Sequence, residues 1–229
     1  MNSQVSDISR RLAAVRERIA VAAHRSGREP AAVRLLPVTK FQPPEKVAAL
    51  LELGEKAFAE NRVQDLVERA QAWPQSEWHL IGPLQSNKAK SAAAHADWIH
   101  SIDSAELCVR LGRLAVAAGR RPKVLIQVNV TGEASKSGCT PEELPALLAA
   151  AAAEPGLELK GLMTMGEAEA SPEEIRAAFA QLRQLRDRHR EAFPGLSELS
   201  MGMSGDFELA VEEGATLVRV GSSILGDRA

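Results

Sequence analysis

The sequence predicts an α/β fold: a single (β/α)8 TIM barrel that occupies residues 1–229 and carries an extra helix at its N-terminus. Short apolar runs alternate with longer amphipathic segments along the whole chain, without a linker or low-complexity segment between them. Eight such runs can be counted, whereas a doubly wound open sheet usually ends after about five or six strands. The sequence also lacks the glycine-rich dinucleotide fingerprint and the P-loop that would favour an open sheet.

Each predicted strand is a short apolar run that glycine, proline or polar residues terminate. The strongest is 124–130, which reads as a strand buried on both faces of a parallel sheet. The first, 35–40, ends where Pro43 and Pro44 prevent its continuation. The predicted strands cover 35–40, 57–61, 78–81, 98–101, 124–130, 157–165, 198–201 and 217–220.

The segments between the strands have apolar residues at helical spacing. In the first of them Ile8, Leu12, Val15 and Ile19 recur with arginines between them, which indicates an amphipathic surface helix rather than a secretion signal. No run approaches the roughly 20 apolar residues of a membrane span. The further predicted helices cover 44–53, 62–72, 85–95, 104–119, 141–154, 172–193 and 206–213.

Composition excludes several classes of function. The formal net charge is -2, which gives no reason to expect a nucleic acid or an anionic membrane as partner. The two cysteines, Cys108 and Cys139, have neither CxxC spacing nor a histidine cluster beside them. They are predicted to be free thiols of a reducing compartment rather than metal ligands, so we expect a cytoplasmic protein.

Lys40 ends the first predicted strand on an apolar face. Because a strand alternates its faces, Leu36, Val38 and Lys40 point to one side. Burial lowers the pKa of a lysine, and a neutral amine is a nucleophile that forms Schiff bases with aldehydes. A strand-end lysine that reaches into solvent is the commoner case, so other parts of the chain must decide between the two.

Small residues follow the seventh and eighth predicted strands, where barrels commonly hold phosphate. The segments are 201–206, which contains Ser204, and Gly221-Ser222-Ser223. Glycines let backbone N–H groups approach an anion closely, and serine hydroxyls add donors. Ordinary turn chemistry explains either segment alone, whereas the pair at the two expected positions indicates phosphate binding.

Arg219 lies in the last predicted strand on the same face as Leu217. An inward arginine needs a partner, either a carboxylate of a neighbouring strand or a ring nitrogen or anionic group of a ligand. Asn61 and His79 are polar groups at similar depth, and each could equally be a hydrogen-bonded core residue. The segment 135–138 could form a lid, although a solvated loop is the commoner case.

One ligand would account for these groups together. A phosphorylated aldehyde with a ring nitrogen would place its phosphate on the glycine-serine loops, its aldehyde carbon on Lys40 and its nitrogen near Arg219. Pyridoxal 5'-phosphate has all three features.

Long stretches of the chain resemble the YggS/PROSC-type pyridoxal phosphate homeostasis proteins. The two most specific are Trp78–Lys88 (WHLIGPLQSNK) and Leu199–Ser204 (LSMGMS). The other matching stretches are 35–40, 59–61, 127–129, 135–138, 161–163 and 218–221.

This resemblance implies a barrel of the alanine racemase N-terminal-domain type, with Lys40 as the covalent Schiff-base lysine. It implies phosphate contacts from Ser204, Gly221 and Ser222, with Ser223 beside them. It also implies Arg219 facing the pyridine nitrogen and Asn61 near the ring. Ser222 and Ser223 stand where threonine is expected in many relatives, and the hydroxyl group is retained.

The family has no established catalytic activity, and the resemblance implies a carrier or buffer in intracellular vitamin B6 homeostasis that passes its cofactor to apo-enzymes. The chain contains no tyrosine, and only nine residues follow Val220, so we expect neither the second catalytic base of a racemase nor its second domain. We therefore also expect a monomer. One alternative is a pyridoxal phosphate-dependent racemase or lyase that uses His79 or another residue at the barrel mouth as second base. The other is a regulatory module that contacts another protein when ligand occupancy changes the loop 135–138.

Overall fold

The computed structural model describes residues 3–131, 137–166 and 170–226. In these ranges eight parallel strands form one sheet in the order β1-β8-β7-β6-β5-β4-β3-β2. The strands are β1 (Arg34–Pro37), β2 (Ala57–Glu60), β3 (Glu77–Leu80), β4 (Trp98–Ile102), β5 (Lys123–Gln127), β6 (Glu158–Met163), β7 (Glu198–Ser200) and β8 (Leu217–Val220).

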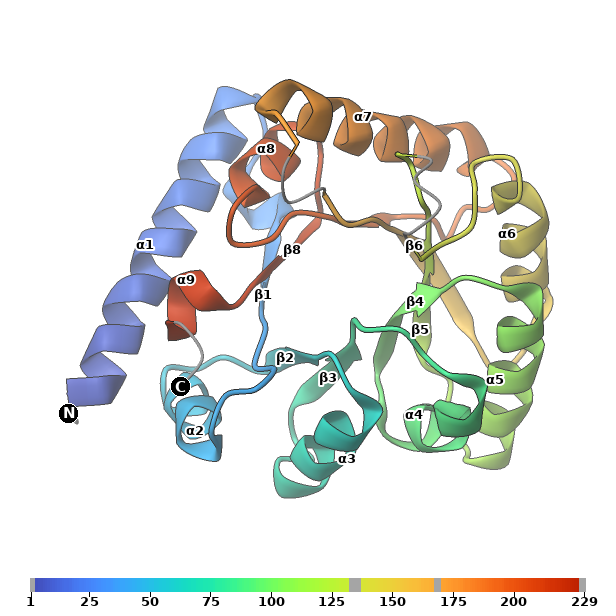
Figure 1. Ribbon diagram of the computed structural model, residues 1–229, viewed down its shortest axis with the longest axis horizontal. Coiled ribbons are helices and arrows are strands. Elements are labelled where there is room, and N and C mark those ends of the chain that lie inside the picture. Colours follow the sequence, from blue (N-terminus) through green and yellow to red (C-terminus); the bar gives the residue numbers. More distant parts are fainter. Residues whose placement is uncertain (1–2, 132–136, 167–169, 227–229) are drawn as a thin grey trace.

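The two ends of this order, β1 and β2, meet and close the sheet into a barrel. Val38, which follows β1, forms a parallel bridge with Ala59 of β2. The N–H group of Thr39 donates to Ala59 O at 2.9 Å, and the N–H group of Val38 donates to Val220 O of β8 at 2.9 Å. The strands and the helices that alternate with them confirm the predicted (β/α)8 barrel (Figure 1).

Helices surround the strands on the outside of the barrel (Figure 1). Two short 3-10 helices, η1 (Pro30–Ala32) and η2 (Ser86–Lys88), lie between the larger elements. No helix within the described ranges is both long and apolar enough to cross a membrane. The α-helices are α1 (Ser3–Arg25), α2 (Pro44–Glu52), α3 (Val63–Ala72), α4 (Ala89–His95), α5 (Ala105–Ala117), α6 (Leu144–Ala153), α7 (Pro172–His189), α8 (Phe207–Glu212) and α9 (Ser222–Leu225).

Two strands end three residues earlier than the sequence predicts. The fifth was expected to reach Val130, but β5 ends at Gln127 because the backbone beyond it pairs with Cys139: Asn129 N donates to Cys139 O, and Cys139 N donates to Gln127 O, each at 2.9 Å. The first was expected to reach Lys40, but β1 ends at Pro37. Val38 forms only an isolated bridge, and the chain turns at Lys40 and Phe41. The short helix α9, directly after β8, was not predicted.

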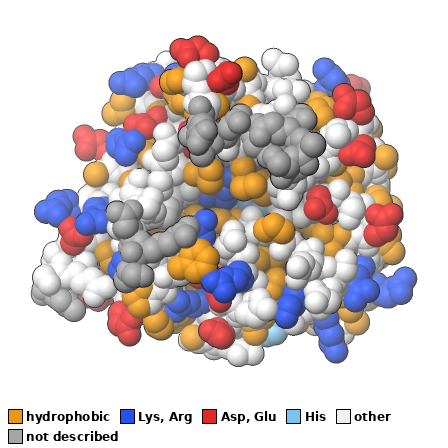
Figure 2. All heavy atoms as spheres, viewed as in Figure 1, with side chains coloured by type: hydrophobic (Ala, Val, Ile, Leu, Met, Phe, Trp, Pro, Cys, Tyr) orange, Lys and Arg blue, Asp and Glu red, His pale blue; other side chains and the backbone are white. Residues whose placement is uncertain are grey.

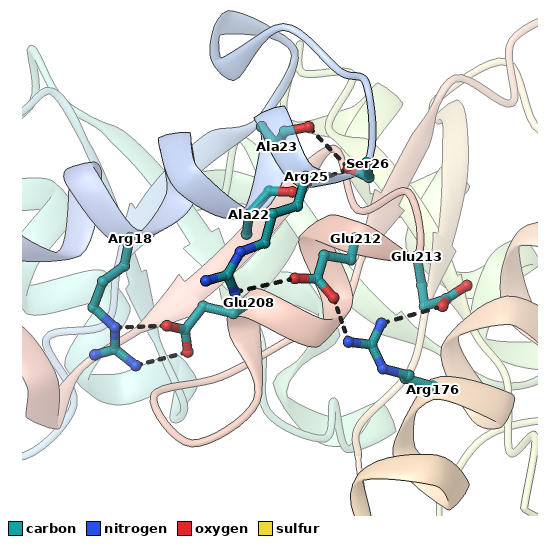
Figure 3. A network of polar contacts seen from close by, with 9 residues as sticks. All are labelled: Arg18, Ala22, Ala23, Arg25, Ser26, Arg176, Glu208, Glu212 and Glu213. Atoms are coloured by element: carbon teal, nitrogen blue, oxygen red, sulfur yellow. Dashed lines mark hydrogen bonds and ion pairs between the residues drawn. The ribbon is translucent and has the colours of Figure 1, made fainter.

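The extra N-terminal helix α1 packs along α8 and α9 and so joins the two ends of the chain (Figure 1). Arg18 forms two hydrogen bonds to the Glu208 carboxylate, at 2.8 and 2.7 Å, and Arg25 lies 3.8 Å from Glu212 (Figure 3). Both arginines are exposed, and surface ion pairs of this kind contribute little to stability. The buried stripe of α1 therefore holds it in place: Val5, Ile8, Leu12, Val15, Ile19, Ala22 and Ala23.

The interior of the barrel contains two small apolar clusters and a set of buried polar groups. Leu36, Val38, Ala59 and Leu217 form one cluster, and Trp98, Leu125 and Met163 form the other. The buried polar side chains include His79, His100, Ser200 and Arg219. Because buried polar groups require hydrogen-bond partners, this interior is more constrained than an apolar core.

Candidate functional site

A cavity of about 410 Å³ opens at the carboxyl ends of the strands. Its lining comes from β8 and from the segments that follow β1, β3, β7 and β8, which is the edge where barrel proteins bind ligands. Figure 2 shows this face of the molecule, hollowed near its centre. The lining brings together five of the residues singled out in the sequence: Lys40, Ser204, Arg219, Gly221 and Ser222.

Lys40 lies in the turn that follows β1 and is half-buried. Gln42 N donates to Thr39 O at 3.0 Å, which closes this turn. Within it Phe41 has a φ angle of 60°, in the left-handed region that residues other than glycine rarely adopt. The turn directs the Lys40 side chain toward the same cavity that Val38, on the inner face of the barrel, lines.

A buried carboxyl group supports this turn from the helix side. Thr39 Oγ1 donates to Glu60 Oε1 at 2.6 Å. Arg69 of α3 lies 3.8 Å from the same carboxylate through Nε, and its Nη2 donates to Gln42 O at 2.6 Å. Burial raises the pKa of Glu60 to about 7, against the opposing effects of the Thr39 hydrogen bond and the Arg69 charge. Glu60 and Arg69 therefore hold both ends of the turn that carries Lys40.

The loops after β7 and β8 are joined at Ser204. Its Oγ accepts hydrogen bonds from the N–H groups of Gly221, at 3.3 Å, and Ser223, at 3.4 Å. A Cβ atom on Gly221 would lie 3.2 Å from the carbonyl oxygen of Val38, so a larger residue would require the backbone after β1 to move by a few tenths of an ångström. Two backbone N–H groups thus converge beside serine hydroxyls, as in anion-binding sites.

Arg219 lies at the base of the cavity and is 3% exposed. Its Nη1 donates to Ser200 Oγ at 2.7 Å, and its Nη2 donates to Thr164 O at 2.9 Å. Burial lowers the pKa of Arg219 to about 10, and the carboxylate of Asp206 opposes the shift. The guanidinium therefore remains charged at neutral pH and is fixed from two sides.

Other residues singled out in the sequence do not line the cavity. Asn61 follows β2, with its backbone carbonyl against Gly82, and Ser223 lies in α9. His79 is buried below the cavity and makes hydrogen bonds with His100 and Glu77. Of the loop 135–138, residues 135 and 136 lie outside the described residues.

Three contributors to the site were missed in the sequence. Ser200 fixes Arg219, and Glu60 supports the Lys40 turn, as described above. Gln42 lines the cavity, and its Oε1 is buried with no hydrogen-bond partner among the described atoms. A carboxylate at the end of the apolar run of β2 was the available signal for Glu60, whereas an ordinary serine or glutamine offers none.

The comparisons with known proteins agree with this architecture. Residues 11–229 match the family model described as "Alanine racemase, N-terminal domain". The pyridoxal phosphate homeostasis protein of Pseudomonas aeruginosa is 43% identical over 226 residues, which cover 98% of this chain and 97% of the relative.

Two solved structures are similar along nearly their whole length. A protein of unknown function from Bifidobacterium adolescentis has a TM-score of 0.93 at 36% identity and covers 98% of this chain, which in turn covers 96% of it. PipY of Synechococcus elongatus, solved with pyridoxal phosphate bound, has a TM-score of 0.84 at 38% identity. The match covers 96% of this chain and 100% of PipY. The chain therefore belongs to the family of pyridoxal phosphate homeostasis proteins, whose barrel is that of the alanine racemase N-terminal domain.

Proposed function

We propose that this chain binds pyridoxal 5'-phosphate and acts in its homeostasis as a carrier or buffer. The observation that carries the proposal is that Lys40, the serine-glycine loops and Arg219 line one cavity. Its volume, about 410 Å³, lies in the range of small-molecule sites. The names of the relatives described above support the same ligand.

The residues present fit the cofactor group by group. Lys40 would hold the aldehyde covalently, and Ser204, Gly221, Ser222 and Ser223 would hold the phosphate through hydroxyl and backbone N–H groups. Arg219 would face the pyridine nitrogen and Asn61 would lie near the ring. Gln42 Oε1, which has no hydrogen-bond partner among the residues that the structure describes, offers the cavity a further acceptor.

We propose that the chain holds the cofactor without turning over a substrate. Bound pyridoxal phosphate supplies an electron sink for carbanions, but a charged arginine beside its ring nitrogen keeps that nitrogen unprotonated and weakens the sink. The sequence contains no tyrosine to act as a second base, and His79 lies outside the cavity lining. Binding and release to apo-enzymes, rather than racemisation, suit this set of residues.

We further propose that the protein acts as a monomer in the cytoplasm. Its two cysteines are buried free thiols, and burial raises the pKa of each to about 12, so both resist oxidation. Size-exclusion chromatography with light scattering measures the molecular mass in solution, and a mass of two chains would contradict the monomer.

The test of cofactor binding is the visible absorbance of the protein after addition of pyridoxal phosphate, followed by borohydride reduction and peptide mass analysis. We expect a visible band and a reduced adduct on Lys40. Lys40→Ala should lose both, whereas Lys90→Ala, which removes an exposed lysine of α4, should retain them. An adduct of unchanged stoichiometry in Lys40→Ala would refute the assignment of Lys40. Sustained racemisation of an added amino acid would refute the carrier function.

A further inference from the structure

A continuous chain of side-chain hydrogen bonds crosses the interior of the barrel below the cavity. Arg219 Nη1 donates to Ser200 Oγ at 2.7 Å, and Ser200 Oγ lies 2.9 Å from His100 Nδ1. His100 Nε2 lies 2.9 Å from His79 Nδ1, and His79 Nε2 lies 2.8 Å from Glu77 Oε1. Glu77 is the first residue of β3, so this series of hydrogen bonds ends at the mouth of the barrel opposite the cavity. We call these five residues the interior relay.

The relay is buried between its two ends, whereas the Glu77 side chain at the far end is 30% exposed. Ser200, His79 and His100 are fully buried, and Trp98 stacks on the His79 ring with centroids 5.3 Å apart. Burial lowers the pKa of His79 to about 4 and holds that of His100 well below its usual range. Both rings are therefore neutral at neutral pH, and each carries a single proton on one of its two nitrogens.

The carboxylate of Glu77 decides where those protons lie. Burial alone would raise the pKa of Glu77, but the hydrogen bond from His79 and the charge of Arg34 outweigh it and lower this pKa, so the group is ionised. A carboxylate can only accept, so the proton between Glu77 and His79 belongs to His79 Nε2. Arg34 Nη2 also approaches this nitrogen, at 3.3 Å, but a bare Nε2 would set a lone pair against the carboxylate at 2.8 Å.

One proton assignment then follows for the whole relay. With its proton on Nε2, His79 accepts at Nδ1 from His100 Nε2–H, and His100 in turn accepts at Nδ1 from the hydroxyl of Ser200. The Ser200 oxygen keeps its lone pairs for Arg219 Nη1. Every donor points from the cation at one end toward the anion at the other, an arrangement in which neighbouring hydrogen bonds polarise and strengthen one another.

We propose that Glu77, His79, His100 and Ser200 are positioning residues that orient the Arg219 guanidinium toward the bound cofactor and couple it to the opposite mouth of the barrel. The effect of the relay on the cofactor rests on the proposed function, whereas the arrangement of protons within the relay does not. Thr164 O accepts from Nη2, so the relay governs the Nη1 side of the guanidinium. Reversing one member requires reversing all the others, because each ring nitrogen has one partner in the relay.

The first test reads the tautomers directly and needs no cofactor. Long-range proton–nitrogen NMR spectra of the protein at neutral pH should show an unprotonated Nδ1 in both His79 and His100. Glu77→Gln should add a second tautomer to both rings, because an amide can donate as well as accept. Asp97→Asn is the matched control: it removes a carboxylate near the same mouth that binds Trp78 N and Arg120 rather than the relay. A protonated Nδ1 in either wild-type ring, or equal spectra for the two variants, would overturn the proposal.

The second test measures cofactor affinity by equilibrium titration with pyridoxal phosphate. Ser200→Ala should weaken binding by about tenfold, the value of one hydrogen bond to a charged group, and Glu77→Gln should weaken it less but in the same direction. Ser101→Ala, which removes an equally buried hydroxyl bonded to Gly82 O, should leave affinity unchanged. Affinity equal to that of Ser101→Ala in both relay variants would overturn the coupling to the cofactor. A wild-type protein that binds no pyridoxal phosphate would refute the proposed function and leave the tautomer test standing.

Discussion

Single atoms determine the anion site. Ser204 Oγ is the acceptor for two backbone N–H groups that belong to the next loop, those of Gly221 and Ser223. A phosphate oxygen is a stronger acceptor than a hydroxyl, because it carries charge. An incoming phosphate would therefore take these N–H groups over and leave the hydroxyl of Ser204 free to donate to it.

The double variant Ser204→Ala, Ser222→Ala tests the phosphate assignment. We expect the affinity for pyridoxal phosphate to fall at least about tenfold, since two hydroxyl donors to a charged group are lost. Thermal unfolding should remain close to that of the wild type, because both residues are partly exposed. Ser91→Ala, an exposed serine of α4, is the control for both measurements. If the double variant bound pyridoxal phosphate with wild-type affinity, the phosphate would not bind at Ser204 and Ser222.

At the scale of elements, the turn that carries Lys40 depends on helix α3 as well as on its own strand. Arg69 of α3 binds Gln42 O, and Glu60 at the end of β2 binds Thr39 Oγ1. The other oxygen of Glu60, Oε2, is buried and has no hydrogen-bond partner among the described atoms. A buried, half-satisfied carboxylate is costly when ionised, so this support carries a pH dependence.

Glu60 should make the fold less stable as pH rises. Its folded pKa, about 7, lies above the unfolded value of 4.5, so the folded chain binds more protons between these two values and loses stability as pH increases through them. The loss should approach about 3 kcal/mol above pH 7. Denaturant unfolding at about pH 5 and pH 8 measures it. Glu60→Gln should remove this dependence of the free energy of unfolding on pH. Glu68→Gln, at an exposed position on α3, should leave the dependence unchanged. Equal pH profiles for both variants would disprove it.

At the scale of the whole molecule, the barrel could be predicted because its signals are local. Most strands are short segments rich in apolar residues, and the ends of parallel strands meet at one edge, so Lys40, Ser204 and Arg219 could be assigned to one site. The interior relay could not be predicted in this way. His79 and His100 lie on β3 and β4 but Ser200 lies on β7, and their meeting depends on strand tilt and register across the barrel.

The same distinction between local and long-range contacts applies to helix α1, which packs against α8 and α9 (Figure 1). Two kinds of contact could hold it: the exposed ion pair of Arg18 with Glu208, and the buried stripe that includes Leu12. Leu12→Ala should lower the free energy of unfolding by about 3 kcal/mol, because it leaves a cavity. Arg18→Ala should cost less than about 1 kcal/mol. Urea unfolding of the two variants decides between them: a larger loss in Arg18→Ala would mean that the ion pairs hold α1. Helix α1 packs against α9, and α9 directly follows Gly221 of the cavity lining. Leu12→Ala should therefore also weaken cofactor binding, whereas Arg18→Ala should not.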